Sequence, residues 1–104
     1  MELNDFFETS ILLGYYKNIL SEKQREYMID HFEMDYSLSE IAKKHNISRQ
    51  AVYDNIKRGI AILKEYEEKL GFYKRDMEMK EELEELKVNY SDKRLTEIIQ
   101  RLEG

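Results

Sequence analysis

The stretch SLSEIAKKHNISRQAVYDNIKR, residues 37–58, decides the fold of this chain. Ser37 and Glu40 have the spacing of a capping box, in which two side chains satisfy free amides at the start of a helix. Asn46 follows this short segment, and asparagine is one of the few residues that tolerate left-handed backbone angles. Ser48 can cap a helix that begins after it. The stretch therefore predicts two helices joined by a tight turn.

The apolar residues of this stretch predict how the two helices cross. Ala42 is small enough to lie where the first helix crosses the second at a steep angle. Ile47, Val52 and Ile56 have the spacing that packs the second helix against the first. Together with a turn at Asn46, this constellation predicts a helix-turn-helix.

If those positions are buried, helical geometry directs the opposite face of the second helix outward. Arg49 and Gln50 lie near the start of that face, and their side chain types suit guanine and adenine at the edge of the major groove. The lysines and arginines around them are placed to meet phosphates. Asp54 either accepts a hydrogen bond from cytosine or neutralises Arg58 four residues on. The candidate nucleic-acid-binding residues are Lys43, Lys44, Ser48, Arg49, Gln50, Tyr53, Asp54, Lys57 and Arg58.

The charge distribution singles out the same segment. The chain has 104 residues, 41% of them hydrophobic and 38% charged, and a net charge of -5. Residues 38–64, however, carry six basic and two acidic side chains, a local charge of +4 between acidic flanks. Because the whole chain is acidic, long-range attraction to DNA should be weak at physiological salt. The alternative is an ordinary helical hairpin whose charged face is solvated, and the capping and apolar patterns favour the helix-turn-helix.

A first helix is expected over residues 4–19, with Asn4 as its cap. Gly14 interrupts this helix at a cost of about 1 kcal/mol relative to alanine, so we expect Gly14 to pack closely against another element. The broad apolar face expected for this helix consists of Leu3, Phe6, Phe7, Ile11, Leu13, Tyr16 and Leu20.

Two more helical segments complete an N-terminal bundle of four helices. Ser21 and Gln24 form a second capping box, which predicts a helix to about Glu33. The helix capped by Ser48 contains no breaker until Gly71, which can end it. The core residues expected from the helix after Ser21 are Tyr27, Met28 and Phe32.

The last third of the chain is charged and prone to form helices, with a cap at Ser91. Its apolar residues form narrow stripes, which pack either on their own bundle or on a second copy of the chain. We expect a homodimer. The predicted fold is all-α, with a helix-turn-helix domain at residues 1–71 and a helical tail at residues 72–104 that serves dimerisation or packing. The stripes are Met79, Leu83, Leu86 and Tyr90, then Leu95, Ile98, Ile99 and Leu102.

Composition argues against several classes of function. Cysteine is absent, which removes disulfides, thiolate metal sites and cysteine nucleophiles. His31 and His45 are far apart and are expected on helix surfaces or rims, so we expect no metal site. The glutamates of residues 81–85 are expected to form a solvated face, and we expect neither an enzyme nor a cofactor. The acidic N-terminus and the lack of a long apolar run predict a cytoplasmic protein with no membrane partner.

Several segments of the chain resemble segments of known protein families. Residues 20–26 and 37–42, LSEKQRE and SLSEIA, look like the promoter-reading C-terminal region of bacterial sigma factors. Residues 48–58, SRQAVYDNIKR, resemble the signature of the YlxM family of small helix-turn-helix proteins, with similar flanks at residues 15–16 and 66–70. The sequence departs from the sigma pattern because it lacks the polymerase-binding body around this region.

The resemblance to the YlxM family covers about residues 6–75 and implies a role in the signal recognition particle pathway. The implied protein partner is Ffh, the GTPase of that particle. We therefore expect a small regulatory protein that binds DNA, or structured RNA, through the helix of residues 48–58. The alternative is an adaptor that docks on a component of the particle and binds no DNA.

Overall fold

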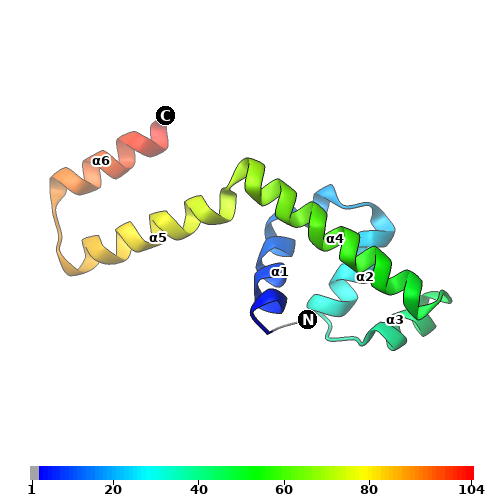
Figure 1. The fold of residues 1–104 in the computed structure, drawn as a ribbon. Coiled ribbons are helices and arrows are strands. Elements are labelled where there is room, and N and C mark those ends of the chain that lie inside the picture. The colour runs from blue at the N-terminus through cyan, green and yellow to red at the C-terminus, as the bar shows by residue number, and fades with distance from the viewer. Residues whose placement is uncertain (1–2) are drawn as a thin grey trace. The chain divides into compact units, whose positions relative to one another are not determined.

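A computed structural model describes the backbone of residues 3–104 and the side chains of residues 5–104. Within this range the chain forms helices and turns and no strand, so the all-α prediction is confirmed. Figure 1 shows α1, α2 and α3 grouped around the long α4, with α2 passing behind it. The elements are α1 (Leu3–Tyr16), the 3-10 turn η1 (Lys17–Ile19), α2 (Glu22–Phe32), α3 (Leu38–His45), α4 (Arg49–Leu70), α5 (Phe72–Val88) and α6 (Asp92–Glu103).

The chain divides into two compact units, Met1–Phe72 and Tyr73–Gly104. The first unit contains α1–α4 and almost all of the buried apolar side chains. Its core is built around α4, which packs against each of the other three helices. The buried apolar residues of this unit are Leu12, Leu13, Tyr16, Leu20, Tyr27, Met28, Phe32, Ile41, Ala42, Val52, Ile56 and Leu63.

The buried face of α1 differs from the predicted one. Phe7 and Ile11 are 58% and 40% exposed, whereas Thr9 and Leu12 are buried. Leu13, Tyr16 and Leu20 are buried as predicted. Helical periodicity places Thr9 and Leu12 on the same side as Leu13, so the prediction was wrong for Phe7 and Ile11. The helix also begins at Leu3, so Asn4 lies in its first turn rather than before it, and the side chains of both residues lie outside the described range.

Gly14 is not a packing glycine. A Cβ atom added there would meet no atom within 4 Å, so the prediction of close packing was wrong. The close contact occurs instead at Gly59 on α4, where an added Cβ would lie 2.8 Å from the sulfur of Met28. The missing side chain at Gly59 is therefore what lets α2 approach α4.

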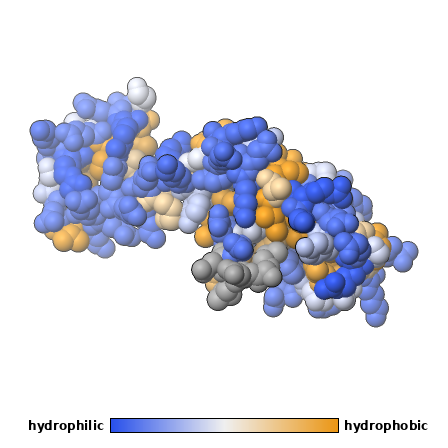
Figure 2. Space-filling model, viewed as in Figure 1, coloured by the Kyte–Doolittle hydropathy of each residue, from blue (hydrophilic) through white to orange (hydrophobic). Residues whose placement is uncertain are grey.

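The second unit is a helical hairpin of α5 and α6. Leu86 and Ile98 are its buried apolar side chains. Arg94 bonds Glu85 at 3.1 Å, and Arg101 pairs with Glu82 further along the hairpin. Ser91 caps α6 as predicted by accepting a hydrogen bond from the Arg94 amide. The remaining apolar side chains of the predicted stripes are half-buried or exposed, and smaller apolar areas are visible over this unit than over the first (Figure 2).

Candidate nucleic-acid interface

The helix-turn-helix forms as the sequence predicts. The Ser37 hydroxyl accepts a hydrogen bond from the Glu40 amide, and the Glu40 carboxylate accepts one from the Ser37 amide, each at 3.1 Å. Asn46 has φ 55° and ψ 47°, the left-handed conformation that turns the chain between the helices. Ser48 then caps α4 through a 3.0 Å bond from the Ala51 amide. These local bonds satisfy backbone groups that the helix ends would otherwise leave free.

Apolar packing fixes the crossing of α3 and α4. Ile41 and Ala42 on α3 are buried, as are Val52 and Ile56 on α4, while Ile47 in the turn is half-buried. Ala42 is therefore buried, as a position at the helix crossing requires, and we expect a larger side chain there to separate the helices. Once this face is buried, the opposite face of α4 points away from the core.

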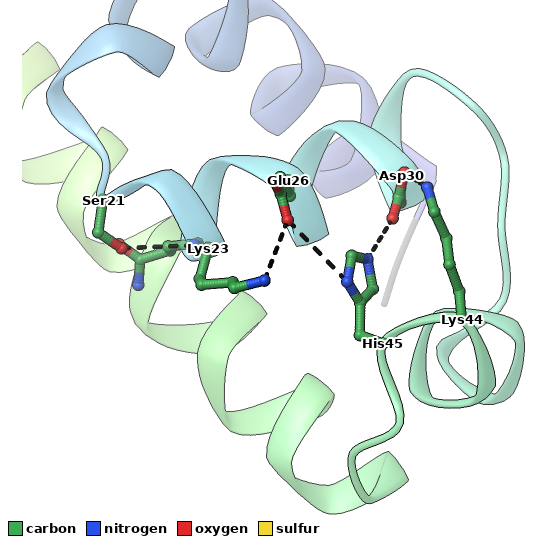
Figure 3. Close-up of polar contacts among 7 residues, drawn as sticks. Ser21, Lys23, Glu26, Asp30, Lys44 and His45 are labelled. Carbon is green, nitrogen blue, oxygen red and sulfur yellow. Dashed lines mark hydrogen bonds and ion pairs between the residues drawn. The ribbon is translucent and has the colours of Figure 1, made fainter.

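A polar cluster that sequence reasoning missed fastens α3 to α2. Asp30 of α2 is only 5% exposed, and its two carboxylate oxygens bond Lys44 at 3.0 Å and His45 at 2.9 Å. The other ring nitrogen of His45 lies 3.9 Å from Glu26, which also pairs with Lys23. Figure 3 shows the α2 carboxylates facing Lys44 and His45 at the end of α3. The cluster therefore holds the first helix of the motif against the bundle.

The electrostatics of Asp30 show that the cluster favours the ionised carboxylate. Burial raises the pKa of Asp30, but hydrogen bonds and charge from His45 and Lys44 outweigh it, and the pKa lies below its ordinary value. The same bond to Asp30 raises the pKa of Lys44. Lys44 also lies over the Tyr36 ring, 5.3 Å from its centroid. Lys44 is thus an anchoring residue of α3 as well as a predicted phosphate contact.

Both histidines are more constrained than predicted. His45 is packed edge-on against Tyr27, with ring centroids 4.8 Å apart, and bonds Asp30 rather than lying on a rim. His31 is half-buried, and its Nδ1 lies 2.8 Å from the Tyr36 carbonyl. No group of three or more His, Asp or Glu side chains within residues 5–104 could hold a metal ion.

The second predicted capping box is only half formed. The Ser21 hydroxyl accepts a bond from the Gln24 amide at 3.3 Å, as predicted. The Gln24 side chain, however, donates to the carbonyl of Asn55 at 3.3 Å rather than returning to Ser21. Gln24 therefore links α2 to the backbone of α4.

All nine predicted site residues are exposed, and those of α4 share its outer side. The Gln50 amide donates to the Asp54 carboxylate at 3.0 Å, whereas Arg58 donates to the backbone carbonyl of Asp54 at 3.4 Å. The Asp54 carboxylate therefore bonds Gln50. It does not neutralise Arg58, which was one of the two alternatives predicted for it. Tyr53 is 46% exposed and can present its ring to a ligand.

Four cations of the motif have no anionic partner within the described part of the chain. Lys43, Arg49, Lys57 and Arg58 form no ion pair with a carboxylate of residues 5–104. On the same α4 helix, by contrast, Lys69 pairs with Glu65 at 2.8 Å. The motif thus combines a buried crossing, a left-handed turn and an outward surface of free positive charge, which defines a protein of the helix-turn-helix class.

Comparison with known proteins agrees with this class and narrows it. Residues 3–102 match the family model described as "Putative helix-turn-helix protein, YlxM / p13 like", UPF0122. A UPF0122 protein of Fusobacterium nucleatum is 53% identical over 98% of this chain and 99% of its own length. The UPF0122 protein YlxM of Bacillus subtilis is 41% identical over 99% of this chain and 97% of its own length. The chain belongs to the UPF0122, or YlxM-like, family of helix-turn-helix proteins, so the predicted resemblance is confirmed.

None of the helices in residues 3–104 is long and apolar enough to cross a bilayer.

Proposed function

We propose that this protein is a regulatory nucleic-acid-binding protein that inserts the first half of α4 into a groove of DNA or structured RNA. The observation that carries the proposal is the set of four free cations, Lys43, Arg49, Lys57 and Arg58, in a chain whose net charge is -5. Because phosphates supply most of the affinity of such interfaces, cations without carboxylate partners are the side chains best able to bind them.

The arrangement along α4 also separates two kinds of contact. Arg49 lies in the first turn of α4, where the start of a recognition helix reaches base edges. Gln50 follows Arg49, and its amide nitrogen already donates to the Asp54 carboxylate. Gln50 and Asp54 can therefore offer a base their remaining amide hydrogen and their free oxygen acceptors as one unit. Lys57 and Arg58 lie about two turns further on, where a recognition helix meets the backbone of the duplex.

A fluorescence titration tests this proposal. Labelled random-sequence duplex DNA and a labelled RNA hairpin are titrated with the protein at about 50 mM salt, where phosphate contacts are strongest, and again at about 200 mM. We expect binding that weakens steeply with salt for at least one of the two ligands. Absence of salt-dependent binding to both would contradict the proposal.

We extend the proposal to self-association through the α5–α6 hairpin. Only Leu86 and Ile98 of its apolar stripes are buried, and Leu83, Ile99 and Leu102 remain exposed. A hairpin of this size has little core of its own, and exposed apolar helix faces of this kind favour a second copy. Analytical sedimentation at micromolar concentration should give a dimer, and a monomer would contradict this part of the proposal.

The role in the signal recognition particle pathway that the YlxM resemblance implies is part of the same proposal. The expected protein partner is Ffh. A pull-down from a lysate with this protein as bait, with and without nuclease, tests whether Ffh is retained. Retention that needs intact RNA supports a complex assembled on nucleic acid. Retention that survives nuclease supports the adaptor that docks on protein.

A further inference from the structure

An open groove of about 460 Å³ lies beside the exposed face of α4. The end of α2, the start of α3 and the first half of α4 all contribute to it. Its apolar lining consists of Leu38, Ile56 and Ile60, of which Ile56 is buried and the other two are half-buried. These three side chains therefore form the floor.

The rim of this groove is aromatic and cationic. Arg49, Tyr53 and Lys57 line it from α4 and are all exposed. Arg49 and Lys57 are two of the cations that form no ion pair with a carboxylate of residues 5–104. They are eight residues apart on one helix, a separation of about 12 Å along its axis. An occupant of this groove thus meets an apolar floor between two positive charges.

The apolar floor favours a protein occupant over a nucleic acid. A recognition helix enters the major groove with its convex surface, and the duplex offers mostly polar base edges and phosphates. Such groups gain little by replacing water over Leu38, Ile56 and Ile60, because only apolar surface benefits from that burial. A leucine or phenylalanine side chain from a protein gains from it directly.

We propose that this groove is a docking site for an acidic amphipathic segment of a partner protein. An apolar side chain of the segment covers the floor at Leu38 and Ile60, and carboxylates on either side of it pair with Arg49 and Lys57. A helical segment matches the spacing, because residues about two turns apart on one face are separated by the distance between the two cations. The site does not depend on nucleic-acid binding, although both ligands would use Arg49 and Lys57.

The direct test uses two synthetic peptides as probes. The first is a fluorescein-labelled helix of about 15 residues with leucines at alternating three- and four-residue spacing and glutamates elsewhere. The second carries glutamine in place of every glutamate. We expect the acidic probe to bind the full-length protein saturably below about 100 µM. The neutral probe should bind about tenfold more weakly, because it lacks the charges that face the rim.

Paired variants separate the groove from general charge effects. Ile60→Gln places an amide over the floor, and Ala61→Gln makes a similar change at the next, exposed position outside the groove. Lys57→Glu reverses a rim charge, and Lys69→Glu reverses a charge further along the same helix. Ile60→Gln and Lys57→Glu should each raise the Kd of the acidic probe about tenfold, with less than about twofold change in their controls.

Circular dichroism confirms that each variant is folded, and Leu38→Gln provides a second test of the floor if Ile60→Gln unfolds the protein. Several results would overturn the proposal: no binding of the acidic probe, equal binding of both probes, or equal effects of a groove variant and its control. A change of sedimentation coefficient in Ile60→Gln with no probe binding to the wild type would also overturn it. In that case a second copy of the chain, rather than another protein, covers the groove.

Discussion

The two units of this protein hold their helices together by different means. The unit of α1–α4 buries a dozen apolar side chains and leaves the cations of its outer α4 face unpaired. The α5–α6 hairpin buries Leu86 and Ile98 and pairs Arg94 and Arg101 with glutamates on the facing helix. Apolar burial in the first unit thus leaves four cations of the helix-turn-helix available to a ligand, whereas two arginines of the hairpin pair with glutamates of its own helices.

The largest expected effect comes from truncating the core of the first unit. Leu63 is fully buried on α4, and Leu63→Ala should lower the free energy of unfolding by about 2–5 kcal/mol, because the change leaves a cavity. Val88 of the hairpin is 81% exposed and lies outside the apolar stripes, and Val88→Ala should change the free energy of unfolding by less than about 0.5 kcal/mol. Urea unfolding followed by circular dichroism measures both. Similar losses would contradict the view that apolar burial in the first unit dominates stability.

Over-packing the helix crossing should have the next largest effect. Ala42→Leu adds a branched side chain where α3 meets α4, and should cost about 1–3 kcal/mol of unfolding free energy. Ala61 is exposed on α4, and Ala61→Leu is the matched control. Thermal melts of the two variants compare them. An unchanged melting temperature in Ala42→Leu would show that α3 and α4 accommodate a larger side chain at this position.

The Asp30 cluster should make the stability of the first unit depend on pH. Because the pKa of Asp30 is lowered in the folded state, its contribution is complete above the ordinary pKa and is lost as the pH falls through the lowered value. Asp30→Asn should therefore cost about 1.5 kcal/mol near neutral pH. The difference from the wild type should shrink as the pH falls from about 5 to 2. Urea unfolding across this range measures it, and a constant difference would contradict the account of the cluster.

The ion pairs of the hairpin should have the smallest effect on stability. Arg101→Gln removes the pair with Glu82 and should speed hydrogen exchange in α6, because that pair joins the two helices. The effect should fade at about 1 M salt, where exposed charges are screened. Lys93 forms no ion pair within the described range, so Lys93→Gln is the control. Equal exchange in the two variants would show that the pair contributes nothing.

The sequence predicted the parts of the fold that local bonds determine. The turn at Asn46 and the caps at Ser37, Ser48 and Ser91 depend on residues within a few positions of each other, and the structure confirms all four. The helix end at Gly71 is of the same kind, with a left-handed φ of 63°. Such signals are readable because the side chain and the backbone group that it satisfies are neighbours in sequence.

The remaining features depend on partners far away in sequence. Gly59 matters because Met28 of another helix approaches it, and Gly14 is free of such an approach although the two glycines look alike in sequence. Asp30 in the middle of α2 gives no local sign that Lys44 and His45 will meet it. The same holds for the candidate site, where sequence placed the cations on one surface but could not separate those with a carboxylate partner from those without one.

The measurement that tests the central claim most directly is the salt dependence of nucleic-acid binding in two lysine variants. Lys57 is free on the outer face of α4, and Lys69 lies on the same helix but is paired with Glu65. Both Lys57→Ala and Lys69→Ala remove one positive charge. The slope of log Kobs against log salt should fall by about one in Lys57→Ala, which loses a phosphate contact, and stay unchanged in Lys69→Ala. Equal slopes in both variants would contradict the claim that the unpaired cations of the helix-turn-helix form the binding surface.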